Sequence, residues 1–366
     1  MMVSRAWVKE HLWVPVQEWA LRFVCRFPVL SDFYYCVDRS FHREHRAVLM
    51  GRLAHRDSIA RKEGDGAAAT LRRSIHRIEK GLVMRPRRES FAVGYIEETV
   101  ELFQSAVEEA RRNGQTDGSL VRWGHDVLSE YFAVVTDAPV IAQARARFEQ
   151  VDWKCGSTLP ESTPSKPYRR GLRKSAIGYH ALLNLSKQRR SVRWYQARRV
   201  PREIIDRAVV VAANAPSACN RQSFRFLVFD EPEVAARLGD IPGGTSGFSG
   251  NFPCFVIVVG SLRAYPRERD RHVIYIDGSL AVMSFQFALE VQGVGSCCIN
   301  WPDLEVSEKR LRSVIDLDED DRVIMCLSIG YPDPDGLIPF SQKKDLDEVR
   351  TYDSKVHLTG LSRICP

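Results

Sequence analysis

A polar segment at residues 154–175 divides the chain, and the parts on either side of it carry different hydrophobic patterns. The segment reads KCGSTLPESTPSKPYRRGLRKS, so it is rich in Ser, Thr, Pro, Lys and Arg and poor in apolar residues. That composition is typical of a linker between domains. The chain has 366 residues, 44% of them apolar, which is enough for a separate core on each side. We therefore predict a first region at 1–153, a linker at 154–175 and a second domain at 176–366.

The part before the linker has the periodicity of amphipathic helices. Apolar residues recur every three or four positions in 93–112, with glutamates between them, and the same spacing recurs in 118–135. A further helix is expected at 138–150. Residues 40–150 are accordingly predicted to form an all-helical region.

The run TLRRSIHRIEKGL at 70–82 is the most motif-like part of this region. We interpret it as a basic helix that ends at Gly81 and turns Ile75 and Ile78 inward. The alternative is functional, with His76 and its neighbours reaching a substrate or a cofactor.

After the linker, helical and strand patterns alternate, which predicts helices packed on a sheet of about four strands. The continuous apolar run at 252–259 indicates a strand that is covered on both faces. The predicted strands are 224–229, 252–259, 296–301 and 323–329. The predicted helices are 177–188, 201–212, 275–292 and 307–314.

A cluster of donors follows the first of these helices, in the sequence QRRSVRWY at 188–195. Arg189, Arg190, Ser191 and Arg193 place four donor side chains within five residues. Arginine forks match the oxygens of a phosphate two at a time, so the cluster is suited to binding an anion. The same pattern also occurs on ordinary solvated surfaces.

A second polar segment, APSACNRQSFRF at 215–226, leads from a predicted helix into a predicted strand. Ser217, Asn220 and Gln222 offer donors and acceptors for the edge of a planar heterocycle, and the small Ala218 leaves room for a ring. The alternative is an ordinary helix-to-strand connection.

Taken together and in this order, these segments resemble the nitroreductase family of flavin enzymes. That family has an RRSxRxY-like opening, then V-P-x-E-x-I, then A-P-S-x-x-N-x-Q-x-(F/W)-x-F, and each pattern occurs here. The resemblance covers about residues 176–352. The matching segments are Arg189–Tyr195, Val200–Ile204, Ala215–Phe226, Asp277–Gly295, Ile329–Pro332 and Lys343–Val349.

The resemblance implies an α+β fold with a mixed sheet flanked by helices, preceded here by a mostly helical N-terminal region. It also implies FMN bound at the interface of a homodimer. The cofactor-binding residues that it implies are Arg189, Arg190, Ser191, Arg193, Pro216, Ser217, Asn220, Gln222, Gly293, Gly295 and Lys343.

These residues fall into groups with different implied roles. The first four match the segment that contacts the flavin phosphate, ribityl chain and ring. The loop residues match the segment that lies along the ring from the other subunit, and the two glycines match a backbone turn near the reactive nitrogen, where the amides of Val294 and Gly295 are candidate donors. Lys343 matches a basic residue that closes on the phosphate. We assign Arg193 to the pyrimidine edge, where a fixed positive charge would favour negative charge on the reduced ring.

The implied activity is that of an FMN-dependent oxidoreductase that takes hydride from NAD(P)H and reduces a small organic substrate. No side-chain acid or base is shared across the family, so no catalytic residue is predicted. Two alternatives stay open: a flavin-dependent dehydrogenase or oxidase without nicotinamide, and a non-catalytic protein of this fold acting in surface-polysaccharide production. The glycine-rich segment at 243–250 is interpreted as either a mobile active-site loop or a plain linker.

Charge and cysteine content bear on the remaining classes. The net charge of +7 lies in residues 1–175, the linker included, whereas residues 176–366 are balanced; this is consistent with an anionic partner or with a solvated helical face. No nucleic-acid motif is present, and the histidines and cysteines show no metal-site spacing. The nine scattered cysteines, several of them in apolar runs, favour reduced thiols in a cytoplasmic chain. No apolar run is expected to span a bilayer, although the aromatic segment 7–35 is a candidate for peripheral membrane contact.

Overall fold

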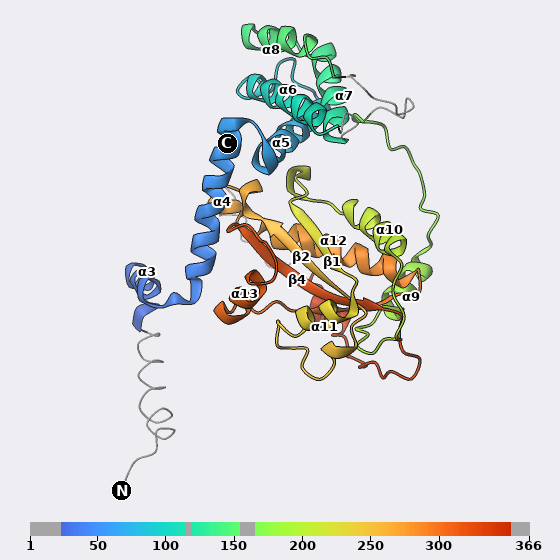
Figure 1. Cartoon of the computed structure of the whole chain (residues 1–366). Helices are drawn as coiled ribbons and strands as arrows, with labels where there is room; N and C mark the ends of the chain where they lie inside the picture. The colour runs from blue at the N-terminus through green and yellow to red at the C-terminus, as the bar shows by residue number, and fades with distance from the viewer. Residues whose placement is uncertain (1–22, 115–118, 154–164, 353–366) are drawn as a thin grey trace.

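The computed structural model of the chain describes residues 23–114, 119–153 and 165–352, and helices alone make up its part before the linker (Figure 1). The predicted all-helical character of 40–150 is therefore confirmed for the described residues. Most of the candidate membrane segment, 7–22, and the first half of the linker, 154–164, lie outside them. The helices are α3 (Pro28–Val37), α4 (His42–Arg61), α5 (Gly64–Leu82), α6 (Ile96–Arg112), α7 (Ser119–Val134) and α8 (Pro139–Glu149), with a 3-10 turn, η2, at Arg39–Phe41.

Helices α5 to α8 share one core. Ile75 and Ile78 of α5 are fully buried in it together with Phe103 of α6 and Leu128 of α7, and burying each such side chain contributes about 1.5–3 kcal/mol. The inward placement of the two isoleucines is confirmed. The prediction that Gly81 ends the helix is wrong, because α5 continues to Leu82. Gly81 instead lets the Phe91 ring pack directly against the helix backbone.

The second domain contains the sheet. Its strands are β1 (Phe224–Phe229), β2 (Cys254–Ser261), β3 (Gly295–Ile299) and β4 (Asp321–Gly330). Its helices are α9 (Tyr179–Gln188), α10 (Arg202–Ala213), α11 (Pro232–Gly239), α12 (Val273–Glu290), α13 (Glu305–Arg312) and α14 (Leu346–Val349). Short 3-10 turns lie at η3 (Ala218–Asn220), η4 (Ser249–Asn251), η5 (Leu262–Ala264) and η6 (Glu268–Asp270).

The strands form one sheet in the order β1-β2-β4-β3, and all three strand pairs are antiparallel. The resemblance to the nitroreductase family implies a mixed sheet. Within the described residues, the parallel component is a single isolated bridge between Ser191 and Ser296. Residues around 191 run alongside β3 without forming a strand of their own.

Helices cover both faces of the sheet, as the continuous apolar run of β2 predicts. Cys254, Val256 and Val258 face a core shared with α10 and α12. The alternate residues, such as Phe255 and Ile257, face a second core shared with α11 and α13. Every residue of β2 is therefore buried.

The cysteines expected in the core differ in exposure. Cys254, Cys297 and Cys326 are buried, and burial raises the pKa of the Cys254 thiol to about 12. Cys298 is exposed on β3, which is an edge strand of the sheet.

Among the described residues, one helical segment is long and apolar enough to cross a bilayer by length and composition. It is Glu268–Glu290, with 23 residues and a mean hydropathy of 1.3, and 50% of its most apolar window is buried inside the protein. The expectation that no run reaches this length is wrong for this segment. It contains α12, which packs on the sheet, and core helices of this kind share the composition of a membrane span.

The N-terminal helices dock on the second domain through α4 and α5. Ala47 of α4 and Ala69 of α5 are buried against Leu262, Ala264 and Ile274. In Figure 1, α4 runs along the flank of the sheet domain and leads up to the α5–α8 cluster. The two parts of the chain thus share a packed junction.

Gly51 sets how closely α4 approaches this junction, because a Cβ atom there would lie 2.8 Å from the Cβ of Leu262. We expect Gly51→Val to lower the free energy of unfolding by about 1–3 kcal/mol through overpacking. Urea denaturation measures this loss. Arg52→Val places the same side chain on the exposed neighbouring position of α4, and a comparable loss in this control would contradict the role of Gly51.

Candidate flavin site

The cationic segment 189–193 lies between α9 and α10 in the sequence. In space it runs parallel to the start of β3, with a bridge between Ser191 and Ser296. The amide of Val192 donates to the carbonyl oxygen of Ser296 at 3.1 Å. Gly295 permits this approach, since a Cβ atom there would lie 2.8 Å from Cγ2 of Val192. The backbone of the segment is therefore fixed beside the start of β3.

Tyr195 anchors the end of this segment in the core. Its hydroxyl lies 2.7 Å from the carbonyl oxygen of Val192 and 2.8 Å from Oγ of Ser328, and its amide donates to Oδ1 of Asn251 at 2.9 Å. Burial raises the pKa of Tyr195, so the hydroxyl stays neutral and remains a donor.

Asn251 ties the glycine-rich segment to the cationic segment. Its Nδ2 donates to the carbonyl oxygen of Arg193 at 2.9 Å. Within the glycine-rich segment itself, Thr245 is fully buried and its hydroxyl bonds the carbonyl oxygen of Gly239, while the Phe248 ring lies 5.5 Å from that of Phe252. These contacts make the segment part of the support for residues 193–195.

The guanidinium groups of the cationic segment are open to an anion. No carboxylate in the described part of the chain forms an ion pair with Arg189, Arg190 or Arg193. Nε of Arg189 is buried and has no hydrogen-bond partner among these residues. An unsatisfied buried donor is costly, so a phosphate placed here would stabilise the segment. The residues present thus fit the phosphate of FMN.

Arg193 stands apart from the other two arginines. Its guanidinium carbon lies 5.8 Å from the centre of the Phe248 ring, and Nη1 makes only a long contact, 3.5 Å, to the carbonyl oxygen of Ser191. The side chain is half-buried. This placement leaves its positive charge available to a bound group.

The two predicted glycines flank the turn from α12 into β3. Gly293 has a φ of +74°, a conformation that side chains disfavour. The turn directs the amide of Val294 to the carbonyl oxygen of Leu289 at 3.0 Å. The candidate role of the Val294 amide as a donor to the flavin is therefore wrong, because that amide is already bonded.

The polar loop 216–222 is held in an unusual backbone conformation. Cys219, Asn220 and Gln222 have φ values of 55°, 54° and 52°, and non-glycine residues in this region are strained and concentrate at functional sites. The amide of Gln222 donates to Oγ of Ser217 at 3.2 Å, and its Nε2 donates to Oδ1 of Asn220 at 2.8 Å. Pro216 is exposed at the start of the loop.

Asp277 of α12 holds this loop through hydrogen bonds to its carboxylate. Both carboxylate oxygens accept from the amide of Ala218 at 3.1 Å, and one also accepts from the hydroxyl of Tyr265. Burial raises the pKa of Asp277, and the bonds from Tyr265 and Ala218 act in the opposite direction. No role for Asp277 was predicted from the sequence. The sequence does single it out, because Asp277 is the sole charged residue of the apolar helix α12 before Glu290.

We expect Asp277→Ala to lower the free energy of unfolding by about 2–3 kcal/mol, because two buried donors lose their acceptor. Chemical denaturation measures the change. Asp277→Asn keeps one acceptor oxygen and should lose clearly less. Equal losses in the two variants would show that the hydrogen bonds to Ala218 and Tyr265 are not what stabilises the loop.

A single chain does not bring the two polar groups together. The loop 216–222 precedes β1 at the end of the sheet where Phe224 pairs with Gly260. The cationic segment runs beside β3, which is the other edge strand of the sheet. It lies near the paired residues Gly295 and Gly330, at the end of the sheet opposite to the loop. Lys343 is exposed in the segment after β4, and its side chain makes no hydrogen bond or ion pair with the described residues.

No group of three or more His, Cys, Asp or Glu side chains is placed to hold a metal ion in the described ranges. The donor set of the site consists of guanidinium, amide and hydroxyl groups.

Comparison with known proteins agrees with this description. The sequence model of the nitroreductase family matches residues 186–245 and 241–331. Iodotyrosine deiodinase 1 of Sus scrofa is 22% identical over 217 residues, which cover 52% of this chain and 73% of the relative. Iodotyrosine deiodinase of Haliscomenobacter hydrossis is 24% identical over 185 residues, covering 43% of this chain and 82% of the relative.

Solved structures are also similar. An FMN-dependent nitroreductase from Clostridium difficile is 23% identical, with 50% of this chain and 99% of that chain covered and a TM-score of 0.37. A nitroreductase in complex with FMN from Desulfovibrio desulfuricans is 18% identical, with 48% and 98% covered and a TM-score of 0.41.

The part of the chain that carries the antiparallel sheet thus matches a family of flavin oxidoreductases. Residues 186–331 are a domain of the nitroreductase family, carried behind a helical N-terminal region. Proteins of this family typically bind FMN, act on small molecules and are often dimers.

Proposed function

We propose that the protein is an FMN-dependent oxidoreductase that reduces a small organic substrate with hydride from NAD(P)H. The observation that carries the proposal is the group of arginines at 189–193, which lack carboxylate partners within the described residues and include a buried Nε of Arg189 without an acceptor. Relatives named iodotyrosine deiodinases support a reductive activity without fixing the substrate.

The chain's own residues would divide the work of holding the cofactor. Arg189 and Arg190 bind the phosphate, and Ser191 contacts the ribityl chain. Arg193 places a positive charge at the ring, which favours negative charge there. FMN, when bound, supplies the hydride transfer.

The separation of the polar groups supports a homodimer. Because the loop 216–222 and the cationic segment lie at opposite ends of one sheet, a complete site takes the loop of one copy and the arginines of the other. The outward faces of α10 and α12 support this arrangement. Val210, Val211, Ile276 and Leu280 are apolar and between 44% and 64% exposed, and an exposed apolar patch is typical of an interaction surface.

Two measurements test the proposal. The visible spectrum of the protein after incubation with FMN and gel filtration reports whether flavin is retained. Anaerobic mixing of that material with NADH or NADPH is expected to bleach the flavin absorption. A colourless protein after incubation would overturn the whole proposal, whereas a colour that persists with both nucleotides would overturn the electron donor.

A further inference from the structure

A second cationic site lies at the junction of the N-terminal helices and the sheet domain. A cavity of about 410 Å³ opens there, within the range of small-molecule sites. Its charged lining consists of Arg56, Arg73, Arg221, Arg267 and Glu98, with His55 beside them. Four guanidinium groups thus face a single carboxylate.

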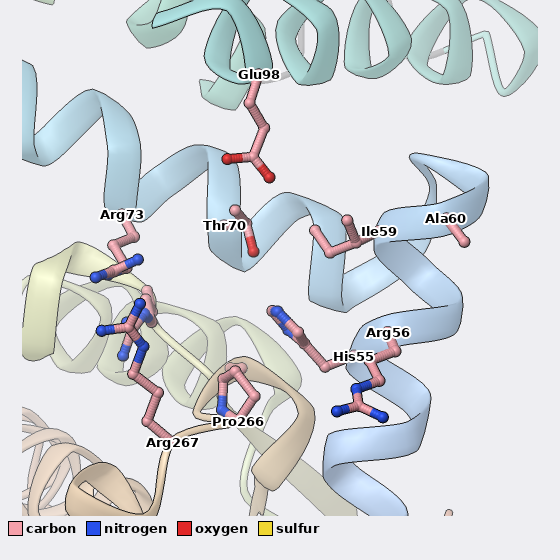
Figure 2. Close-up of a pocket in the computed structure, with 11 residues that line it drawn as sticks. His55, Arg56, Ile59, Ala60, Thr70, Arg73, Glu98, Pro266 and Arg267 are labelled. Atoms are coloured by element: carbon pink, nitrogen blue, oxygen red, sulfur yellow. The ribbon is translucent and has the colours of Figure 1, made fainter. Parts of the chain in front are cut away.

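The lining comes from distant parts of the sequence. His55 and Arg56 lie on α4, Arg73 on α5 and Glu98 on α6, whereas Arg267 follows η5 in the sheet domain. Figure 2 shows Arg73 pointing from α5 toward the guanidinium of Arg267, with Glu98 descending from α6 at the top of the view. The cavity therefore exists only because the helical region packs on the sheet domain.

Arg221 connects this cavity to the polar loop. It stands between Asn220 and Gln222, and its side chain is only 6% exposed. Its guanidinium carbon lies 4.6 Å from the centre of the Tyr265 ring. The loop expected to lie along the flavin thus forms part of the cavity wall.

The positive charges are incompletely compensated. Arg73 and Arg267 form no ion pair with a carboxylate in the part of the chain that the structure describes. Asp270 lies 3.6 Å from Arg221 but is also 3.6 Å from Arg269. Burial lowers the pKa of Arg73, and the charge of Arg221 lowers it further. A bound anion would relieve this repulsion.

We propose that the cavity binds a phosphate group carried by the substrate. Guanidinium groups from three segments, those of Arg73, Arg221 and Arg267, converge on it. A phosphate monoester offers three acceptor oxygens and close to two negative charges at neutral pH, whereas one arginine fork already satisfies a carboxylate. The assignment of the phosphate to the substrate rests on the proposed function; the binding of phosphate by the cavity does not.

Calorimetric titration of the FMN-loaded, full-length protein with inorganic phosphate tests the binding. FMN fills the other arginine cluster, and chloride keeps the ionic strength constant. We expect Arg73→Gln and Arg267→Gln each to weaken phosphate binding by at least about tenfold. Arg267 is exposed, so its loss leaves the packing intact. Arg52→Gln, on the exposed surface of α4, is the matched control and should bind as the parent does.

Several results would overturn the proposal. Parent-like binding in both cavity variants would show that phosphate binds elsewhere or as an adventitious ion only. Succinate that binds as tightly as phosphate would make the cavity a carboxylate site.

The visible spectrum of bound FMN tests separately whether the phosphate belongs to the substrate. Phosphate is expected to perturb the visible spectrum of bound FMN in the parent and not in Arg73→Gln. Phosphate binding without any spectral change would remove the substrate assignment alone. If the protein takes up no FMN, the proposed function fails, and the difference between the parent and Arg73→Gln in phosphate binding still decides the cavity.

Discussion

Arg189→Gln is expected to yield a folded protein that no longer retains FMN through gel filtration. The variant removes a charged donor group whose Nε is buried without an acceptor in the protein itself. A charge-assisted pair with phosphate contributes about 2–3 kcal/mol, so the dissociation constant of FMN should rise about 30- to 150-fold. Quenching of flavin fluorescence on titration with protein measures it.

The control for this prediction is Arg52→Gln, an exposed arginine on α4 that lies outside both the cationic segment and the proposed interface of α10 and α12. It should bind FMN as the parent does. Thermal unfolding of the two variants without flavin should be similar, since Arg189 forms no ion pair in the described structure. An Arg189→Gln protein that binds FMN normally would remove the cationic segment from the site.

Leu280→Asp is expected to separate the proposed dimer and to abolish FMN retention with it. Leu280 is 44% exposed on α12, next to Ile276 at 58% on the same face. A carboxylate buried without a partner in an interface costs several kcal/mol. Because each site would take residues from both copies, the monomer should present only half of it. Light scattering coupled to gel filtration measures the mass, and the visible spectrum measures the flavin.

Leu304→Asp provides the matched substitution, since Leu304 is 60% exposed just before α13, on the other side of the sheet. It should leave both mass and flavin content unchanged. A Leu280→Asp protein that stays dimeric would place the interface elsewhere. A monomeric variant that still retains FMN would show that one chain is sufficient for the site.

The secondary structure of this chain is largely encoded in local patterns. The run at 252–259 predicts a doubly covered strand because its residues are apolar on both faces, and β2 is buried throughout. The amphipathic repeat at 93–112 likewise predicts α6 to its last turn. Where prediction fails, long-range contact decides. Gly81 carries the signal of a helix end, yet the Phe91 ring occupies the space beside it within a continuing helix.

The candidate site can be predicted from the sequence only in part. Its motif residues follow one another closely, so the sequence identifies the cationic segment and the polar loop. Their positions at opposite ends of the sheet depend on strand order, which no local pattern records. The role of Asp277 depends on Tyr265 and Ala218 meeting it in the fold. The cavity at the junction was missed because Arg73 and Arg267 are nearly two hundred residues apart in the sequence.

Arg221 is part of both sites, because its backbone lies in the polar loop while its side chain lines the junction cavity. Whatever fills the cavity restrains the same short peptide that would meet the isoalloxazine. Thermodynamic linkage then makes the effect mutual: the factor by which an occupant changes flavin affinity equals the factor by which flavin changes the affinity of the occupant. The helical extension would thereby couple the binding of the substrate phosphate to that of the flavin through Arg221.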